Sequence, residues 1–260
     1  MRYLLAFAYD GSRFSGFQRG TGERSVEDTI LTCIDKHSLG TRLICCSRTD
    51  RGVSAIMNTA TIDSELSAGR IIGTLNSNIE DIYFYKYSTV PDDFNVRKVQ
   101  WKKYVYLFPS GTLYSKIKLE DLKKFEGNHD FSNFCKLNGR RTERVVIEVG
   151  EEKFQNERAV YFKARGFLWN QIRFFIGYGM ERVRNPETPE DPFSPQYRAR
   201  RLASPELLFL SEIKYENVQF VNYLKKSTAR KINREYLSEF SRNYLMTSLS
   251  CIFDALRSFK

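Results

Sequence analysis

An order of predicted elements, strand-helix-strand-strand-helix-strand, occurs twice in this chain and constrains its fold more than any other feature. Strands are predicted where apolar residues alternate or form short runs, and helices where they recur every three or four positions. The first half has expected strands at 3–9, 43–46, 58–62 and 82–90 and helices beginning at Ser25 and Leu66. The second half has expected strands at 101–108, 143–154, 159–167 and 207–215 and helices at 119–125 and 169–183.

Each repeat of this order predicts the split βαβ, or ferredoxin-like, arrangement. We expect an α/β (α+β) fold with two ferredoxin-like (RRM-like) halves that form a continuous, mostly antiparallel sheet, with helices on one side and a central cleft. Pro91 and the two aspartates after it interrupt regular structure, so the expected domains are 1–95 and 96–260. The prolines between 184 and 205 predict a structured loop or lid rather than a domain linker.

The charge balance predicts a polyanionic partner. The chain carries 41 Lys and Arg against 31 Asp and Glu, a net charge of +10, which is typical of proteins that bind nucleic acid. Arginine-rich loops lie at 13–24 and 140–144. The tail from about 221 predicts either a solvated basic helix or an RNA-contacting surface. Its cations are Lys225, Lys226, Arg230, Lys231, Arg234 and Arg242.

Cysteine and histidine usage restricts the chemistry of any site. The five cysteines are an odd number without a C-x-x-C pair, so we expect reduced, mostly buried thiols and neither a disulfide nor a zinc framework. With two histidines, a His-based triad or a multi-His metal site is nearly excluded. Acid–base chemistry then falls to carboxylates, tyrosines or lysines. No apolar stretch reaches membrane-spanning length, and we expect a cytoplasmic protein.

The stretch from Ser47 to Ala55 is the strongest candidate for a site. It places the carboxylate of Asp50 between the guanidinium groups of Arg48 and Arg51, directly before Gly52. A strand that ends at a charged loop with a glycine is a common place for catalytic residues. The same composition also suits an ordinary turn with solvated charges, and the residues alone leave both interpretations open.

Arg48-Thr49-Asp50-Arg51-Gly52-Val53 resembles the R-T-D-x-G-V signature of the TruA family of tRNA pseudouridine synthases. Further stretches similar to that family occur in the family's order between residue 3 and about residue 215. They are Tyr9-Asp10-Gly11 with Gly16-Phe17-Gln18-Arg19, Val90-Pro91-Asp92-Asp93-Phe94 with Arg97, Lys102-Lys103-Tyr104-Val105-Tyr106, Asp130-Phe131-Ser132-Asn133-Phe134, and Gly166-Phe167-Leu168-Trp169-Asn170-Gln171-Ile172-Arg173.

The resemblance implies an isomerisation of uridine to pseudouridine in tRNA, at positions 38 to 40 of the anticodon stem-loop, by a homodimer without cofactor or metal. It implies that Asp50 is the catalytic nucleophile, that Arg173 is its cationic partner, and that Tyr104 stacks on the uracil and relays a proton. Arg48 would fill the space that the flipped uridine vacates. The other expected substrate contacts are Arg51, Gln18 and Arg19.

Some positions depart from the bacterial form of the family. Ser47 stands where a glycine is usual, Ser54 where a histidine is usual, and Phe17 where a tryptophan is usual. Arg51 replaces a small residue, which makes the loop similar to archaeal or eukaryotic members. Asp50 is retained. Ser54 puts in doubt any role that the usual histidine has.

Plainer interpretations exist for single residues and for the whole chain. Tyr104 on an alternating strand suits a core residue, and Arg173 on an apolar stripe suits a surface arginine. A non-catalytic RNA-binding protein with two RRM-like sheets would need exposed aromatics on its central strands, which the first half lacks in an RNP-like pattern. A carboxylate-pair hydrolase would need a second acid near Asp50.

Asp50 and Arg173 are 173 − 50 = 123 positions apart and fall in different halves. The family assignment nevertheless predicts that their side chains meet within hydrogen-bonding distance at the floor of the cleft. Arg173 should project from the first turns of the 169–183 helix. Such a pair would keep the carboxylate ionised in a water-poor site and aim it at the sugar.

Overall fold

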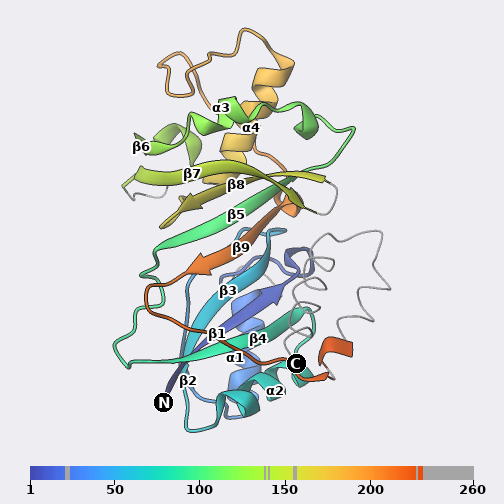
Figure 1. Ribbon diagram of the computed structural model, residues 1–260, viewed down its shortest axis with the longest axis vertical. Coiled ribbons are helices and arrows are strands. Elements are labelled where there is room, and N and C mark those ends of the chain that lie inside the picture. Colours follow the sequence, from blue (N-terminus) through green and yellow to red (C-terminus); the bar gives the residue numbers. More distant parts are fainter. Residues whose placement is uncertain (21–23, 138, 140, 155–156, 227, 231–260) are drawn as a thin grey trace. The chain divides into compact units, whose positions relative to one another are not determined.

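The chain folds into two units in the computed structural model (Figure 1). The structure describes residues 1–20, 24–137, 139, 141–154, 157–226 and 228–230. The first unit contains Met1–Val99 and the described residues from Tyr215 onward, and the second contains Gln100–Lys214. Both units combine helices with mostly antiparallel strands, which confirms the predicted α+β class.

The first unit follows the predicted order of elements. These are β1 (Arg2–Tyr9), α1 (Val26–Lys36), β2 (Thr41–Cys45), β3 (Ser54–Asp63), α2 (Ala68–Asn78) and β4 (Ile82–Val90), with a short 3-10 helix at Gly11–Arg13. β1 lies between β3 and β4, and β2 pairs with β3; all of these pairs are antiparallel. β3 begins earlier than the predicted start at 58 because Ala55 already pairs with Tyr9 of β1.

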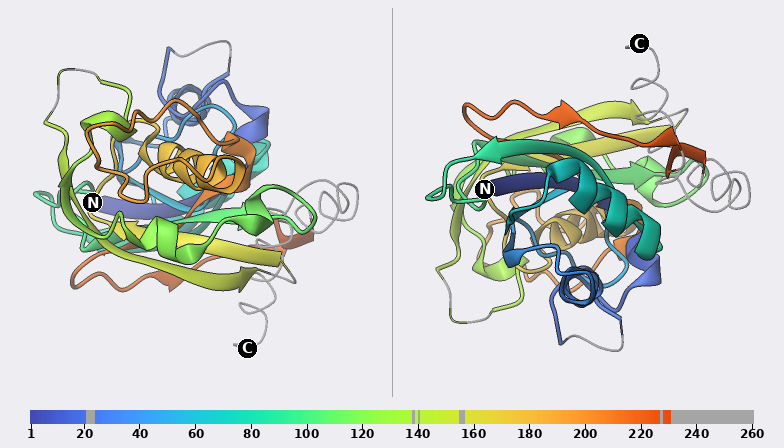
Figure 2. Two further views of the ribbon diagram at one scale, coloured as in Figure 1. Left: turned by 90° about the horizontal axis from the view of Figure 1, so that it is seen from above. Right: turned by 90° about the horizontal axis from the view of Figure 1, so that it is seen from below.

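Local side-chain caps explain where the two helices of this unit begin. The Ser25 hydroxyl accepts the backbone N–H of Asp28 at 3.0 Å, which confirms the predicted cap of α1. The Ser67 hydroxyl likewise accepts the N–H of Arg70, so α2 begins at Ala68 rather than at the predicted Leu66. Both helices lie on the same side of their sheet and pack against each other (Figure 2).

The second unit contains one strand more than the sequence predicted. Its elements are β5 (Trp101–Phe108), α3 (Leu119–Lys123), β6 (Gly127–Asp130), β7 (Glu143–Phe154), β8 (Glu157–Ala164), α4 (Gln171–Arg184) and β9 (Leu208–Lys214). The antiparallel neighbours follow the order β9-β5-β8-β7-β6. β6 has the polar sequence Gly-Asn-His-Asp, which lacks the apolar alternation that marks a strand, and it forms because it pairs with β7.

An aromatic cluster forms the core of the second unit between its helices and its sheet. Phe125, just after α3, stacks on Phe175 of α4 with ring centroids 4.0 Å apart. Phe162 of β8 packs against the same Phe175 ring at 5.7 Å. Phe131 and Phe134 are fully buried around them. Stacked and edge-to-face rings add to the stabilisation that burial of the same area supplies.

The described residues after β9 pack with the first unit, whereas the sequence placed all of 96–260 in a second domain. Tyr215 is buried, and its hydroxyl bonds to Thr59 Oγ1 at 2.6 Å and to the carbonyl of Val96 at 2.8 Å. The strand β10 (Val221–Asn222) then pairs with β4. The predicted helical tail falls mostly on residues 231–260, which lie outside the described residues.

Arg2, the first residue of β1, and Asp63, the last residue of β3, form an ion pair whose contribution to stability depends on pH. Arg2 Nε and Nη2 donate to the two carboxylate oxygens of Asp63 at 2.7 and 2.9 Å. The hydrogen bond from Arg2 lowers the pKa of Asp63 below its ordinary value. A lowered folded-state pKa stabilises the protein above the ordinary aspartate pKa of about 4, and this contribution disappears as the pH falls through the folded-state pKa.

We therefore expect Asp63→Asn to unfold at lower denaturant concentration than the parent at pH 7, with the difference shrinking steadily under acid conditions. Urea unfolding measured as a function of pH checks this. Asp35→Asn, which removes an exposed carboxylate on α1, serves as the control. A destabilisation by Asp63→Asn that stayed constant down to about pH 2 would contradict the ion-pair explanation.

Candidate active site

The loop between β2 and β3 carries Asp50. Asp50 is half-buried, while Arg48 and Arg51 on either side are exposed. The backbone N–H of Val53 donates to the carbonyl of Asp50 at 3.1 Å, closing a turn. Gly52 within this turn has a φ of 85°, a left-handed conformation that favours glycine. The local sequence therefore fixes a tight turn directly after the carboxylate.

Buried hydrogen bonds to Thr49 hold the residue next to Asp50. The hydroxyls of Tyr9 on β1 and Thr49 lie 2.8 Å apart, and both residues are buried. Burial raises the pKa of Tyr9 far above its ordinary value, so this hydroxyl keeps its proton. The carbonyl of Thr49 also accepts the backbone N–H of Phe17 at 3.2 Å. Thr49 is thus bound on both its side chain and its backbone.

A buried amide holds the start of the loop, directly after β2. Asn58 on β3 is fully buried and donates through Nδ2 to the carbonyl of Ser47 at 2.9 Å. Its Oδ1 accepts the N–H of Ser47 at 3.3 Å. Cys46 N–H donates to the carbonyl of Thr59 at 2.9 Å and continues the ladder of β2 and β3. An asparagine that satisfies a loop backbone in this way stabilises one loop conformation.

The turn after β1 packs tightly against the end of the Asp50 loop. Ser54 Oγ accepts the backbone N–H of Gly11 at 3.0 Å. A Cβ added to Gly11 would lie 2.1 Å from the carbonyl oxygen of Val53, so no larger residue fits without moving backbone. Ser54, which stands where the resembled family usually has histidine, therefore links the Asp10-Gly11 turn to the Asp50 loop.

We expect Tyr9→Phe to slow the isomerisation that the family resemblance implies severalfold and to lower the free energy of unfolding by about 1 kcal/mol, because it leaves the buried Thr49 hydroxyl without its partner. Affinity for tRNA should stay at the parent value. Single-turnover rates, filter binding and urea unfolding measure the three quantities.

Tyr83→Phe is the matched control for that variant. Tyr83 is also a buried tyrosine, but its hydroxyl has no hydrogen-bond partner in the part of the chain that the structure describes. Removing this hydroxyl should leave rate and stability unchanged or slightly raise stability. A Tyr9→Phe protein that reacted as fast as the Tyr83→Phe protein would show that the Tyr9–Thr49 bond does not position the loop.

Gln18 and Arg19, two expected substrate contacts, lie next to the Asp50 loop and are exposed. The bond from Phe17 N–H to Thr49 fixes the residue before them. Backbone N–H groups of Arg19 and Gly20 donate to carboxylates at the start of α1, at 3.0 and 3.1 Å. The turn that presents Gln18 and Arg19 is therefore attached to both the loop and the helix.

Tyr104 lies in the middle of β5 in the second unit. It is 8% exposed, and its ring meets the ring of Phe167 edge to face with centroids 5.4 Å apart. Phe162 and Leu210 are its register partners on β8 and β9. Because so little of Tyr104 is exposed, its ring is packed against neighbours on most sides. The interpretation of Tyr104 as a core residue predicts the same burial.

Arg173 lies in the first turn of α4, as the sequence predicts, and is half-buried. Its Nε donates to the carbonyl of Ala203 at 2.8 Å, and its Nη1 donates to Asn170 Oδ1 at 3.1 Å. Asn170 adopts a left-handed backbone with a φ of 65° just before the helix. Ala203 also donates its N–H to the Arg173 carbonyl at 3.1 Å. The proline-rich segment between 184 and 205 therefore contacts Arg173 through Ala203.

The predicted site residues divide between the two units. Asp50, Arg48, Arg51, Gln18 and Arg19 belong to the first, in which Gln18 and Arg19 lie beside the Asp50 loop. Tyr104 and Arg173 belong to the second. The expected meeting of Asp50 with Arg173 therefore stays a prediction.

Sequence reasoning missed the residues that hold the Asp50 loop, which are Tyr9 and Asn58, and it missed the structural role of Ser54. Asn58 had a readable signal, since an asparagine inside an apolar strand needs a hydrogen-bond partner when it is buried. Tyr9 and Ser54 gave none, because an alternating strand and a polar residue after a turn are ordinary.

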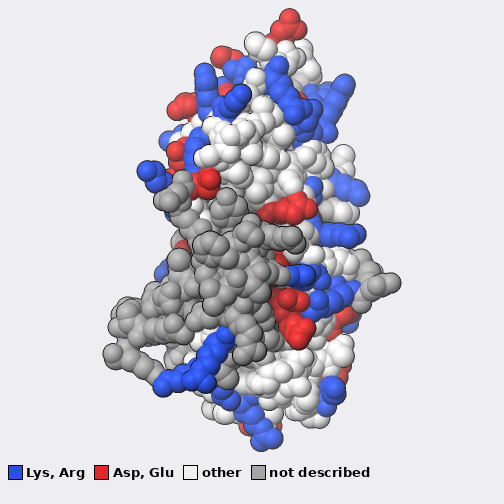
Figure 3. Space-filling view, turned by 90° about the vertical axis from the view of Figure 1, so that its right-hand side faces the viewer, with Lys and Arg blue, Asp and Glu red and all other residues white. Residues whose placement is uncertain are grey.

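The described surface carries charges of both signs. On the face shown in Figure 3, lysine and arginine side chains are spread over the described residues and interspersed with carboxylates. No three His, Cys, Asp or Glu side chains gather as metal ligands among the residues that the structure describes. None of the described helices has the length and apolar character needed to cross a membrane.

Comparisons with known proteins agree on one family. A family model described as tRNA pseudouridine synthase matches residues 122–216. Three curated proteins called tRNA pseudouridine synthase A are similar over most of their length. The protein from Thermoplasma acidophilum is 38% identical over 84% of this chain and 85% of its own, and that from Picrophilus torridus is 34% identical over 86% of both. The protein from Pyrococcus furiosus is 33% identical over 98% of this chain and 97% of its own. These matches show that the chain belongs to the tRNA pseudouridine synthase family and is an isomerase.

Proposed function

We propose that this protein converts uridine to pseudouridine at positions 38 to 40 of the tRNA anticodon stem-loop, with Asp50 as the nucleophile. The observation that supports Asp50 best is the way its loop is held. Before the carboxylate, Tyr9 binds the Thr49 hydroxyl and Asn58 binds the backbone of Ser47. After it, Ser54 holds the end of the loop by accepting the N–H of Gly11. A functional group supported by packed and hydrogen-bonded neighbours is the arrangement that catalysis requires.

The proposed reaction rearranges the atoms of one nucleotide. The N1–C1′ bond breaks, the uracil rotates, and a C5–C1′ bond forms. The C5 hydrogen leaves as a proton and N1 gains one, so no oxidant, reductant or second substrate is needed. A carboxylate at the base–sugar bond can attack C1′, attack C6 or assist glycal formation. Each of these routes needs Asp50 ionised and aimed at the nucleotide.

The other predicted residues would support this chemistry. Arg173 would provide the cation that keeps Asp50 ionised where water is excluded. Tyr104 would stack on the uracil and relay a proton. A uridine in a stem must leave its base stack, which costs a few kcal/mol, and the exposed Arg48 would fill the vacated space. Further contacts to the nucleotide or its neighbours would come from Arg51, Gln18 and Arg19.

Tritium release tests the reaction and its position together. Transcribed tRNA labelled at C5 of uridine should release tritium when the protein is added, because C5 loses its hydrogen. Transcripts in which the uridines at 38, 39 and 40 are replaced by cytidine should release none. Release that persists from those transcripts would place the target elsewhere, and no release from any tRNA would refute the activity.

We further propose that the protein acts as a homodimer in the cytoplasm. The support for the dimer is the family resemblance alone. Light scattering on the purified protein should give about twice the chain mass of 30.5 kDa. A mass of one chain at micromolar concentration would refute the dimer.

A further inference from the structure

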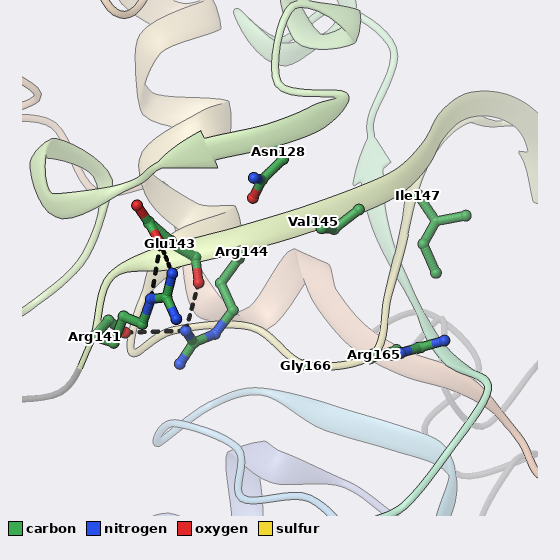
Figure 4. Close-up of a pocket in the computed structure, with 8 residues that line it drawn as sticks. All are labelled: Asn128, Arg141, Glu143, Arg144, Val145, Ile147, Arg165 and Gly166. Atoms are coloured by element: carbon green, nitrogen blue, oxygen red, sulfur yellow. Dashed lines mark hydrogen bonds and ion pairs between the residues drawn. The ribbon is translucent and has the colours of Figure 1, made fainter.

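A pocket of about 610 Å³ lies on the second unit, and neither Tyr104 nor Arg173 is among the residues that line it (Figure 4). Asn128 of β6 and Val145 of β7 are register partners and both line it. Arg165 and Gly166, just after β8, line another side. Val146 pairs with Ala164 and is buried. Because successive strand residues point to opposite faces, Val145 lies on the sheet face opposite to this buried pair.

The pocket carries unopposed positive charge. Three arginines line it, and one of them is neutralised, since Arg141 Nε donates to Glu143 Oε2 at 2.7 Å. Arg144 donates through Nη1 to the carbonyls of Arg141 and Glu143, at 2.9 and 2.6 Å. Arg165 is exposed. Within the described ranges, neither Arg144 nor Arg165 forms an ion pair with a carboxylate.

Apolar side chains lie between these cations. Val145 is 53% exposed and Ile147 is 47% exposed, which are large fractions for β-branched residues on a strand. Figure 4 shows both on β7, with Arg144 beside Val145 and Arg165 below Ile147. A surface of this kind suits a ligand with phosphates at intervals and less polar sugar between them. Arginine is also the cation whose planar fork fits phosphate oxygens best.

We propose that this pocket binds the phosphate backbone of the substrate tRNA at a place other than the reacting uridine. Arg144 and Arg165 bind phosphates, and Val145 and Ile147 pack against the intervening ribose. The carbonyl bonds to Arg144 hold its guanidinium in place before RNA arrives, so less side-chain freedom is lost on binding. The inference rests on the proposed function, because that function supplies the RNA.

The test compares two double variants with equal loss of charge. Arg144→Gln with Arg165→Gln removes both unopposed cations of the pocket. Lys118→Gln with Lys123→Gln removes two exposed cations at and before α3 and is the control. Fluorescence anisotropy with an end-labelled, unmodified tRNA transcript gives the Kd from about 50 to 200 mM salt, the range over which phosphate contacts weaken strongly.

The pocket variant should bind about tenfold more weakly at low salt, and the slope of log Kd against log salt should fall by about 2, roughly 1 per lost phosphate contact. The control should keep the slope of the parent. Because Arg144 bonds to backbone, its replacement can disturb the chain, so Arg165→Gln alone is measured too and should lower the slope by about 1.

Other results overturn the inference. A pocket variant with the Kd and slope of the parent would do so and would leave an acidic peptide as the better ligand. Equal weakening in the control would assign the effect to net charge. The two proposals fail separately: a parent protein that binds tRNA through the pocket but releases no tritium refutes the activity alone. A parent that releases tritium while the pocket variant binds normally refutes the pocket alone.

Discussion

Asp50→Asn should abolish pseudouridine formation, lowering the single-turnover rate at least about 10³-fold, while tRNA binds with close to the parent affinity. The substitution keeps the size of the side chain and removes its charge and nucleophilicity. The loop should keep its conformation because the bonds of Thr49, Ser47 and Val53 do not involve the carboxylate. Tritium release and filter binding on the same preparation separate chemistry from binding.

Asp35→Asn is the control for this variant, since Asp35 is an exposed carboxylate on α1 and its loss changes net charge equally. It should react like the parent. Pseudouridine formed by pure Asp50→Asn protein at close to the parent rate would assign the chemistry to another residue. Loss of tRNA binding together with turnover would make Asp50 a binding residue instead.

Arg173→Met should reduce turnover at least about 10²-fold and also lower the free energy of unfolding, by about 1–3 kcal/mol. Methionine cannot make the bonds that Arg173 donates to Ala203 and Asn170. The stability loss follows because the carbonyl oxygen of Ala203 and the amide oxygen of Asn170 lose these partners. The loss of turnover follows from the expected role of the guanidinium as partner of Asp50. Arg173→Lys restores charge without the planar fork, so it should recover part of the activity.

Arg184→Met, at the exposed C-terminal end of the same helix, controls for the loss of a cation from α4. The decisive comparison is between kcat and KM. If Arg173 aims the carboxylate, Arg173→Met should lower kcat and leave the KM for tRNA nearly unchanged. A variant that is less stable but turns over tRNA like the parent would make Arg173 a structural residue and refute its pairing with Asp50.

Element order was predictable because it depends on local patterns. Ser25 signalled the start of α1, and the apolar stripe from Val26 to Ile34 signalled its buried face. β6 was not predictable, since its four residues carry no apolar signal and it exists through its partner β7. The early start of β3 has the same cause, because it depends on Tyr9 across the ladder.

The candidate site was predictable only in part. The motif around Asp50 is contiguous and therefore readable, but the residues that support it come from β1, from the turn after it and from β3. Ala203, which binds Arg173, lies in a segment whose only recognisable features in the sequence were its prolines and arginines. Contacts between residues distant in sequence depend on the finished fold, and no local pattern encodes them.

The contacts of Tyr215 have a consequence for how the protein is made. Because Thr59 and Val96 bind a residue that follows the whole second unit, the first unit cannot complete its packing until about 215 residues have been synthesised. β4 likewise waits for β10 to pair with its free edge. At a synthesis rate of roughly 5–20 residues per second, the nascent first unit remains incomplete for several seconds while the inserted second unit is translated. The second unit is continuous in sequence and can fold first, so the order of folding need not follow the order of synthesis.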